Sequence, residues 1–346
     1  MRLPSTSVRR LLLVLIVAVL CLTVAVDAKS KDCRKTKNKK KKGCRKPGKK
    51  KPAKSPSPRP QSPPPPSSPS PLPSPSSSPP PSPPSSPYLI SYDVVRTRDW
   101  DPALFTQGLQ VARACSTCPK RVYASSGLRG ASYISSMDVN TLETVDRTDL
   151  ADDEFGEGVN VLDGKMYQVT FQTDALKVYD ARSLELVDTM RHPRADGWGL
   201  TDNGLELIMS DGSSNLVYFR PDNPSQATRE LEVTFEGSPV RNLNELEYRD
   251  GYIYANVWRR PCIAKIDTAT GDVVGWLDGS RLKAAAVDPG RSPSPPYATF
   301  DHPINGVAWD GDRMWVTGKY WTKVFEVKET GATRIEDVEA VKRLCL

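Results

Sequence analysis

Glu157 is the side chain whose sequence setting best suits proton-transfer chemistry. It lies between Gly156 and Gly158 and follows Phe155, in the run Phe-Gly-Glu-Gly. Burial beside aromatic rings raises the pKa of a carboxyl group, and such a group can act as a general acid or base near neutral pH. An exposed Glu on a β-hairpin would have the same local sequence, so the surrounding pattern must decide between the two interpretations.

The segment around Glu157 predicts a β-hairpin, and similar units recur along the chain. An apolar strand runs to Asp163-Gly164, and an alternating strand, Met166 to Phe171, returns from that turn. Units that recur at intervals of roughly 40 to 60 residues are typical of a β-propeller. We therefore predict an all-β fold, a five-bladed β-propeller over residues 88–346. The five units begin at Gln107, Glu157, Gly197-Trp198, Asn244 and Asn305.

The first strand of each propeller blade lines the central channel, so the residues that open the repeats should meet at one end of it. We predict a binding pocket there, because a carboxylate, an ammonium group, amides and aromatic rings would surround one opening. The alternative is a narrow channel plugged by aromatic rings, in which Glu157 pairs with Lys319. The residues expected at this mouth are Phe105, Gln107, Phe155, Glu157, Trp198, Asn244 and Asn305, with Trp258 and Lys319 overhanging from the ends of second strands.

Residues 1–28 have the composition of a secretory signal peptide. Arg2, Arg9 and Arg10 precede an apolar run, and small residues at positions 26–28 would permit cleavage. The alternative is a membrane anchor formed by residues 11–26, although this stretch is slightly short for a full span. We expect a secreted or cell-wall protein, in which disulfides can form.

Residues 29–54 are a basic tract with 15 Lys and Arg, and residues 55–87 are almost entirely Ser and Pro. We expect the tract to be disordered, because it has too few apolar side chains to offset its ordering entropy. The Ser/Pro segment should form a polyproline II linker.

The charge of the chain is divided between this tract and the rest. The whole chain has a net charge of +7, whereas residues 88–346 carry 29 Lys and Arg against 39 Asp and Glu, a net charge of −10. An acidic body makes nucleic acid a poor partner. The basic tract could bind acidic polysaccharide or another anionic surface, or it could be a solvated charged run without a partner.

Six cysteines follow Cys21 and can pair in an oxidising compartment. The spacing of Cys115 and Cys118 fits a disulfide at a hairpin tip, with a redox or zinc element as the alternative. The remaining pairs would be Cys33–Cys44 and Cys262–Cys345. The chain has only 2 His, and we expect neither a metal nor a cofactor at the site.

Several segments outside the pocket also carry structural signals. Strand pairs are expected at Ala175–Tyr179 with Leu184–Asp188 and at Ile263–Asp267 with Val273–Leu277. Pro289–Pro303 reads as a surface loop, and Arg334–Leu346 could form a short helix.

Seven motifs follow one another in the predicted propeller. They are FTQGL at 105–109, FGEG at 155–158, DGWGL at 196–200, NLNELEY at 242–248, ANVW at 255–258, INGVAWD at 304–310 and VTGKYW at 316–321. Together they resemble the plant-type glutaminyl-peptide cyclotransferases. These are five-bladed propellers that convert the N-terminal Gln of peptides to pyroglutamate and release ammonia. The resemblance extends from about Tyr92 to Val327.

The resemblance implies a role for each mouth residue. Glu157 would be the catalytic acid/base, and Asn244 and Lys319 would be polar partners of the reacting amide that stabilise its oxyanion. The substrates would be peptides or proteins with an N-terminal Gln. Burial should raise the pKa of Glu157 while Lys319 lowers it, so the two effects compete. The walls would be Phe105, Gln107, Phe155, Phe171, Trp198 and Trp258.

Two positions depart from the family pattern. Ala124 replaces an acidic residue that usually begins a run like ESTGLYG, and Phe171 stands where Trp is usual. Neither departure removes the proposed acid/base. The Ser/Pro linker and Ala124 would also suit a second hypothesis, a binding or wall-anchored propeller without activity. A metal-dependent, lactonase-type propeller hydrolase is a third hypothesis, but it needs several carboxylate ligands, and Glu157 is the only carboxylate expected at the mouth.

Overall fold

The computed structural model describes residues 86–287 and 302–346. They form an all-β fold with two short helices, α2 (Ser280–Ala286) and α3 (Val338–Cys345). The predicted signal peptide, basic tract, Cys33–Cys44 pair and almost all of the Ser/Pro linker lie outside the described residues, as does most of the Pro289–Pro303 loop. No helix in the described part of the chain is long and apolar enough to cross a membrane.

Three antiparallel sheets of four strands follow one another along the chain, each with its strands in sequence order. The first contains β2 (Thr106–Arg113), β3 (Lys120–Ser126), β4 (Tyr133–Asp138) and β5 (Thr144–Asp149). The second contains β6 (Gly156–Leu162), β7 (Lys165–Thr170), β8 (Ala175–Asp180) and β9 (Leu186–Arg191). The third contains β10 (Leu200–Asp202), β11 (Leu207–Met209), β12 (Asn215–Phe219) and β13 (Ala227–Glu232), and the hairpin β14 (Thr234–Phe235) and β15 (Ser238–Pro239) follows it.

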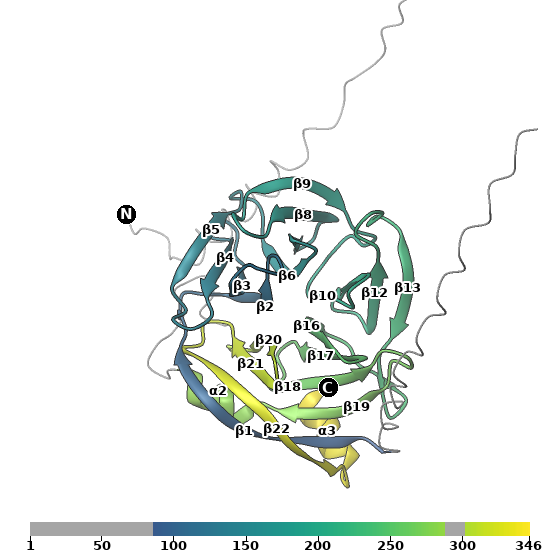
Figure 1. Ribbon diagram of the computed structural model, residues 1–346. Helices are drawn as coiled ribbons and strands as arrows, with labels where there is room; N and C mark the ends of the chain where they lie inside the picture. Colours follow the sequence, from purple (N-terminus) through teal and green to yellow (C-terminus); the bar gives the residue numbers. More distant parts are fainter. Residues whose placement is uncertain (1–85, 288–301) are drawn as a thin grey trace, which may run out of the picture. The chain divides into compact units, whose positions relative to one another are not determined.

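The remaining strands form one eight-stranded sheet in which the two ends of the described chain are neighbours (Figure 1). β1 pairs antiparallel with β22 from Tyr88 opposite Arg334 to Asp99 opposite Lys323, and it meets β19 in parallel only at Tyr88 and Leu89. The sheet order is β16 (Leu243–Arg249), β17 (Tyr252–Val257), β18 (Cys262–Asp267), β19 (Val273–Asp278), β1 (Tyr88–Asp99), β22 (Lys323–Arg334), β21 (Arg313–Gly318) and β20 (Ile304–Asp310).

The strands nearest the centre of Figure 1 are β2, β6, β10, β16 and β20. β2 contacts β6 and β20, β6 contacts β10, and β16 contacts both β10 and β20. These contacts form a closed circuit of inner strands, and each predicted repeat opens at or just before one of them.

Glycine permits the inner strands to approach backbone to backbone. A Cβ atom on Gly199 would lie 1.9 Å from the carbonyl oxygen of Asn244 on the neighbouring strand. The same oxygen accepts a hydrogen bond of 2.6 Å from Ser210 Oγ, and Ser210 Oγ accepts one of 2.8 Å from the Gly199 N–H. Any larger residue at position 199 would therefore displace Asn244.

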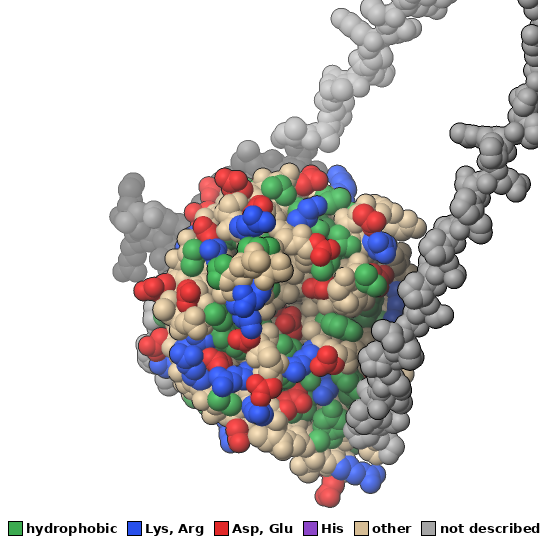
Figure 2. Space-filling model, in the orientation of Figure 1, with side chains coloured by type: hydrophobic (Ala, Val, Ile, Leu, Met, Phe, Trp, Pro, Cys, Tyr) green, Lys and Arg blue, Asp and Glu red, His purple; other side chains and the backbone are tan. Residues whose placement is uncertain are grey.

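The core of the described residues consists of five apolar clusters, each between two neighbouring runs of strands. Strand alternation explains this arrangement, because successive side chains point to opposite faces of a sheet. In β3, Val122 and Ala124 pack against residues of β20–β22, whereas Tyr123 packs against residues of β6–β8. On the surface, Lys/Arg and Asp/Glu side chains are interspersed over the face in Figure 2, so the acidic balance does not gather there into one patch.

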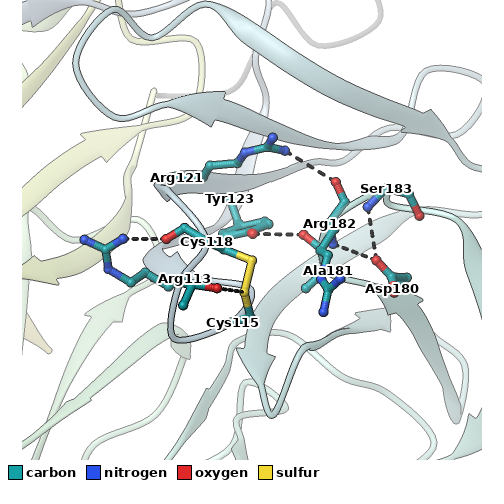
Figure 3. The surroundings of a disulfide bond; sticks show 10 residues. Arg113, Cys115, Cys118, Arg121, Tyr123, Asp180, Ala181, Arg182 and Ser183 are labelled. Atoms are coloured by element: carbon teal, nitrogen blue, oxygen red, sulfur yellow. Dashed lines mark hydrogen bonds between the residues drawn. A yellow bond between two sulfur atoms is a disulfide. The ribbon is translucent and has the colours of Figure 1, made fainter.

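Both predicted disulfides within the described residues are present, Cys115–Cys118 and Cys262–Cys345. Figure 3 shows Cys115–Cys118 in the connection between β2 and β3, beside the turn between β8 and β9. The Tyr123 hydroxyl donates a hydrogen bond of 2.9 Å to the Ala181 carbonyl in that turn. The predicted strand Leu184–Asp188 is shifted, because Leu184 lies in the turn with φ of 57° and β9 begins at Leu186.

The predicted C-terminal helix is confirmed as α3. The Asp337 side chain caps it by accepting a hydrogen bond of 2.8 Å from the Ala340 N–H. Val341 and Cys345 are buried in the cluster between the third sheet and β16–β19. The Cys262–Cys345 disulfide ties this helix to β18.

We expect the two disulfides to contribute unequally to stability. Cys262–Cys345 spans a sequence separation of 83 residues and Cys115–Cys118 a separation of 3. A longer closed loop restricts the unfolded chain more, so Cys262→Ala/Cys345→Ala should lose about 2–4 kcal/mol of unfolding free energy. The matched control, Cys115→Ala/Cys118→Ala, should lose about 1–2 kcal/mol in the same urea titration. Equal losses would contradict this account.

Candidate active site

The polar residues predicted at the mouth lie at irregularities near the start of inner strands. The register of β6 with β7 shifts between Gly156 and Val159, which surrounds Glu157. Comparable shifts surround Gln107 in β2, Asn244 in β16 and Asn305 in β20. A β-bulge bends the strand and re-aims its side chains, and bulges are frequent next to active sites. The side chains at these bulges therefore point in directions that a regular strand would not give them.

A second set of site residues comes from the turns that follow second strands. Phe171, Trp258 and Lys319 directly follow β7, β17 and β21. The next residue in each turn has a left-handed backbone, with φ of 59° at Gln172, 65° at Arg259 and 60° at Tyr320. This repeated turn geometry brings Phe171, Trp258 and Lys319 to the same cavity.

Gly127 occupies the equivalent position after β3, where no side chain would fit. A Cβ atom there would lie 2.5 Å from the ring of Phe155. The glycine thus leaves room for an aromatic wall supplied by the neighbouring sheet.

Apart from Asn305, which was expected at the mouth but does not contribute to the wall, the two sets of residues line one cavity of about 310 Å³. Every mouth residue assigned a role from the sequence contributes to its wall: Phe105, Gln107, Phe155, Glu157, Phe171, Trp198, Asn244, Trp258 and Lys319. Sequence reasoning missed a further lining residue, Arg259. The one signal in the sequence was its position directly after Trp258, which was already expected in the wall.

Glu157 is 5% exposed and lies in an environment that favours its neutral form. Burial raises the pKa of its carboxyl group well above the usual range, and the charge of Asp196 raises it further, while the nearby Lys319 ammonium lowers it. Its Oε1 atom accepts a hydrogen bond of 3.1 Å from Gln107 Nε2. Of the two competing effects expected from the sequence, burial is the larger.

Lys319 is 4% exposed, and its ammonium lies 4.7 Å from the centre of the Phe105 ring. Burial lowers the pKa of Lys319 to about 8, although Glu157 opposes that change. The site thus brings together an acid that is easily protonated and an ammonium that is easily deprotonated. Groups with opposing pKa shifts in one cavity are typical of acid–base chemistry.

Asn305 fixes the orientation of Gln107. Its Nδ2 atom donates to Gln107 Oε1 at 3.1 Å and to the Thr106 carbonyl at 2.9 Å. Because Gln107 Oε1 accepts this bond, the Nε2 atom of the same amide faces Glu157. The sequence placed Asn305 at the mouth but did not indicate that it orients Gln107, because that role depends on how the two side-chain amides face each other.

Asn244 is buried, and its Oδ1 atom has no hydrogen-bond partner within residues 86–287 and 302–346. A buried, unpaired acceptor costs free energy unless a ligand supplies a donor. The sequence interpretation gave Asn244 only a role as an amide N–H donor. The structure adds an acceptor that could bind an N–H of the substrate.

Aromatic rings form two walls of the cavity. Phe155 contacts Phe105 and Phe171 at ring-centroid distances of 6.1 Å and 5.5 Å, and Trp198 contacts Trp258 at 5.7 Å. The Trp198 indole N–H donates to Asp196 at 3.2 Å, which fixes its ring and brings a second carboxylate close to the site. The sequence interpretation had expected Glu157 to be the only carboxylate at the mouth.

Ala124, the departure noted in β3, is fully buried in the core between β2–β4 and β20–β22 and does not line the cavity. The side chain at position 124 is therefore not part of the cavity wall. Among residues 86–287 and 302–346, no cluster of three or more His, Cys, Asp or Glu side chains could hold a metal ion.

The chain is similar to known proteins of one family. A family model described as glutamine cyclotransferase matches residues 72–329. A glutaminyl-peptide cyclotransferase of Arabidopsis thaliana is 36% identical over 243 residues, which are 68% of this chain and 70% of that protein. The crystal structure of Myxococcus xanthus glutaminyl cyclase aligns with a TM-score of 0.62 and 28% identity, over 72% of this chain and 100% of that chain. The chain therefore belongs to the glutamine cyclotransferase family.

Proposed function

We propose that this protein cyclises the N-terminal glutamine of peptides or proteins to pyroglutamate and releases ammonia. The observation that carries the proposal is the burial of Glu157 and Lys319 in one aromatic-walled cavity. The family match and the named relatives support the same activity.

The substrate supplies its own nucleophile, so the enzyme must mainly hold a reactive conformation. The α-amino nitrogen attacks the side-chain carbonyl carbon, a C–N bond forms, and the bond to the amide nitrogen breaks. Packing between the Phe105 and Phe155 wall and the Trp198 and Trp258 wall would favour the folded substrate over extended ones. Preorganisation of this kind is a large part of intramolecular catalysis.

Glu157 would move one proton during this reaction. As a carboxylate it accepts a proton from the attacking amine, and as a carboxylic acid it donates that proton to the leaving nitrogen, which departs as ammonia. Burial raises the pKa of Glu157, so its protonated form is easier to reach than that of an exposed carboxylate. Gln107 holds Oε1 by a hydrogen bond, which leaves Oε2 to exchange the proton.

Lys319 and Asn244 would act on the substrate carbonyl and amide. The Lys319 ammonium is buried beside the Phe105 ring, where its attraction for a developing oxyanion is weakly screened. The Asn244 Nδ2 group can donate to the same oxygen, while its unpaired Oδ1 atom can accept from the substrate amide.

We infer that the scaffold is a five-bladed β-propeller. The closed circuit of five inner strands and the five core clusters between neighbouring runs support this architecture. The blades would be β2–β5, β6–β9, β10–β13, β16–β19, and β20–β22 with β1 as the outer strand.

We also propose that the enzyme is secreted or resides in the cell wall, with residues 88–346 as the catalytic domain. The composition of residues 1–28 and two disulfides within the described residues support an oxidising compartment. The basic tract at 29–54 would attach it to an acidic polysaccharide or another anionic surface.

Glu157→Gln should abolish proton transfer and preserve the fold. The two side chains have similar volume, and Gln can still accept the hydrogen bond from Gln107. We expect turnover of a Gln-initiated peptide to fall on the order of 100-fold or more, as measured by ammonia release. The unfolding free energy should change by less than about 1–2 kcal/mol.

Glu247→Gln provides a matched control for the loss of a buried carboxyl group. Glu247 is buried, burial raises its pKa to about 8, and its Oε1 atom accepts a hydrogen bond from the Trp309 N–H outside the cavity. This variant should cyclise peptides at nearly the wild-type rate. A folded Glu157→Gln variant that is equally active would falsify the role of Glu157.

Lys319→Met should slow turnover and change both limbs of the pH profile. Without the ammonium, the pKa of Glu157 rises, so the activity that requires ionised Glu157 appears only at higher pH. The decline expected in the wild type as Lys319 loses its proton near pH 8 should disappear. The profile of kcat/KM against pH tests both effects. An acid limb that stays in place would exclude electrostatic coupling between the two residues.

Treatment with EDTA or phenanthroline should leave turnover unchanged, because the proposed steps use only side chains of this chain. Ammonia release is compared before and after chelation and after addition of single metal ions. Activity lost on chelation and restored by one metal would favour the metal-dependent hydrolase hypothesis.

A further inference from the structure

Arg259 stands at the edge of the cavity and has no role in the reaction as derived. It is exposed, it lines the cavity, and its guanidinium carbon lies 4.5 Å from the centre of the Trp258 ring. Stacking on an indole face holds the guanidinium in place while its N–H groups remain able to bind a partner.

The backbone at Arg259 adds to this argument. Its φ of 65° lies in the left-handed region, which is costly for residues other than glycine and asparagine. Hydrogen bonds from the Trp258 N–H to the Asn242 carbonyl and from the Arg260 N–H to the Val257 carbonyl fix this turn on both sides. The turn thus fixes the direction in which the Arg259 side chain leaves the backbone.

No ion pair satisfies this guanidinium among the described residues, whereas Arg194 and Arg313 pair with carboxylates. The other charged groups at the cavity are Lys319, Glu157 and Asp196. Lys319 adds a second positive charge, and Asp196 is engaged by the Trp198 indole and the Gln172 N–H. The edge near Arg259 can therefore accept a negative charge from a ligand.

We propose that Arg259 makes the enzyme prefer substrates whose second residue is acidic, Glu or Asp. This proposal rests on the proposed cyclisation of N-terminal glutamine. A cavity of about 310 Å³ is at the small end of ligand sites, so it takes the N-terminal residue and leaves the rest of the peptide outside. The second residue is the first to pass the edge, and each further residue lies roughly 3.5 Å farther along an extended chain.

The experiment compares Gln-Glu-Ala-amide with Gln-Gln-Ala-amide, which differ only in charge at the second residue. The C-terminal amide removes the competing carboxylate. At low ionic strength the wild type should show a kcat/KM about 2- to 5-fold higher for the acidic peptide, a range typical of exposed ion pairs. The difference should lie in KM, because Arg259 does not touch the reacting atoms, and it should shrink at high salt.

Arg259→Gln should bring the ratio close to 1, and Arg259→Lys should retain part of the preference. Arg260→Gln is the matched control, because Arg260 carries the same charge one residue away but donates a hydrogen bond to the Arg343 carbonyl in α3. It should keep the wild-type ratio. A wild-type ratio of 1, or an equal loss in Arg260→Gln, would overturn the proposal. Failure of the wild type to release ammonia from either peptide would instead count against the cyclase function.

Discussion

The antiparallel pairing of β1 with β22 is the constraint on which the other features depend. It joins two 12-residue strands from near the two ends of the described residues, and β2 and β20, which follow β1 and precede β22 in the chain, contact each other in the circuit of inner strands. Once the circuit is closed, β2 and β20 are neighbours, and Asn305 reaches Gln107 across 198 positions of sequence. The hydrogen bond between Gln107 and Glu157 therefore depends on a contact between the ends of the chain.

The electrostatics of the cavity follow from this packing. Inner strands that touch at glycine leave little room for water around Glu157 and Lys319. Dehydration disfavours both charges, so it shifts the two pKa values towards each other. The same packing buries Glu245, whose two carboxylate oxygens accept hydrogen bonds from the Leu109 and Val307 N–H groups of two different inner strands. One buried acid thus joins the inner strands, while another, Glu157, lies in the wall of the cavity.

Much of the site could be predicted from sequence because it repeats. The glycine-flanked openings and strand alternation are local patterns, and they located Glu157, Asn244 and the aromatic walls. Strand β1 was not expected, because its partner lies more than 200 residues away and local sequence carries no sign of it. Arg259 was missed because an exposed arginine is usually a solvated charge, and only the geometry of its turn places it at the cavity.

The bulges that open the inner strands have a consequence for how such a protein could change during evolution. Three of the bulges present a polar side chain to the cavity, Gln107, Glu157 and Asn244, while the apolar cores that stabilise the fold lie between the sheets and contain none of these side chains. A substitution of one of these three side chains changes a group in the cavity wall and removes no side chain from the apolar cores. The scaffold therefore separates the positions that can vary for new substrates from those that must be kept for folding.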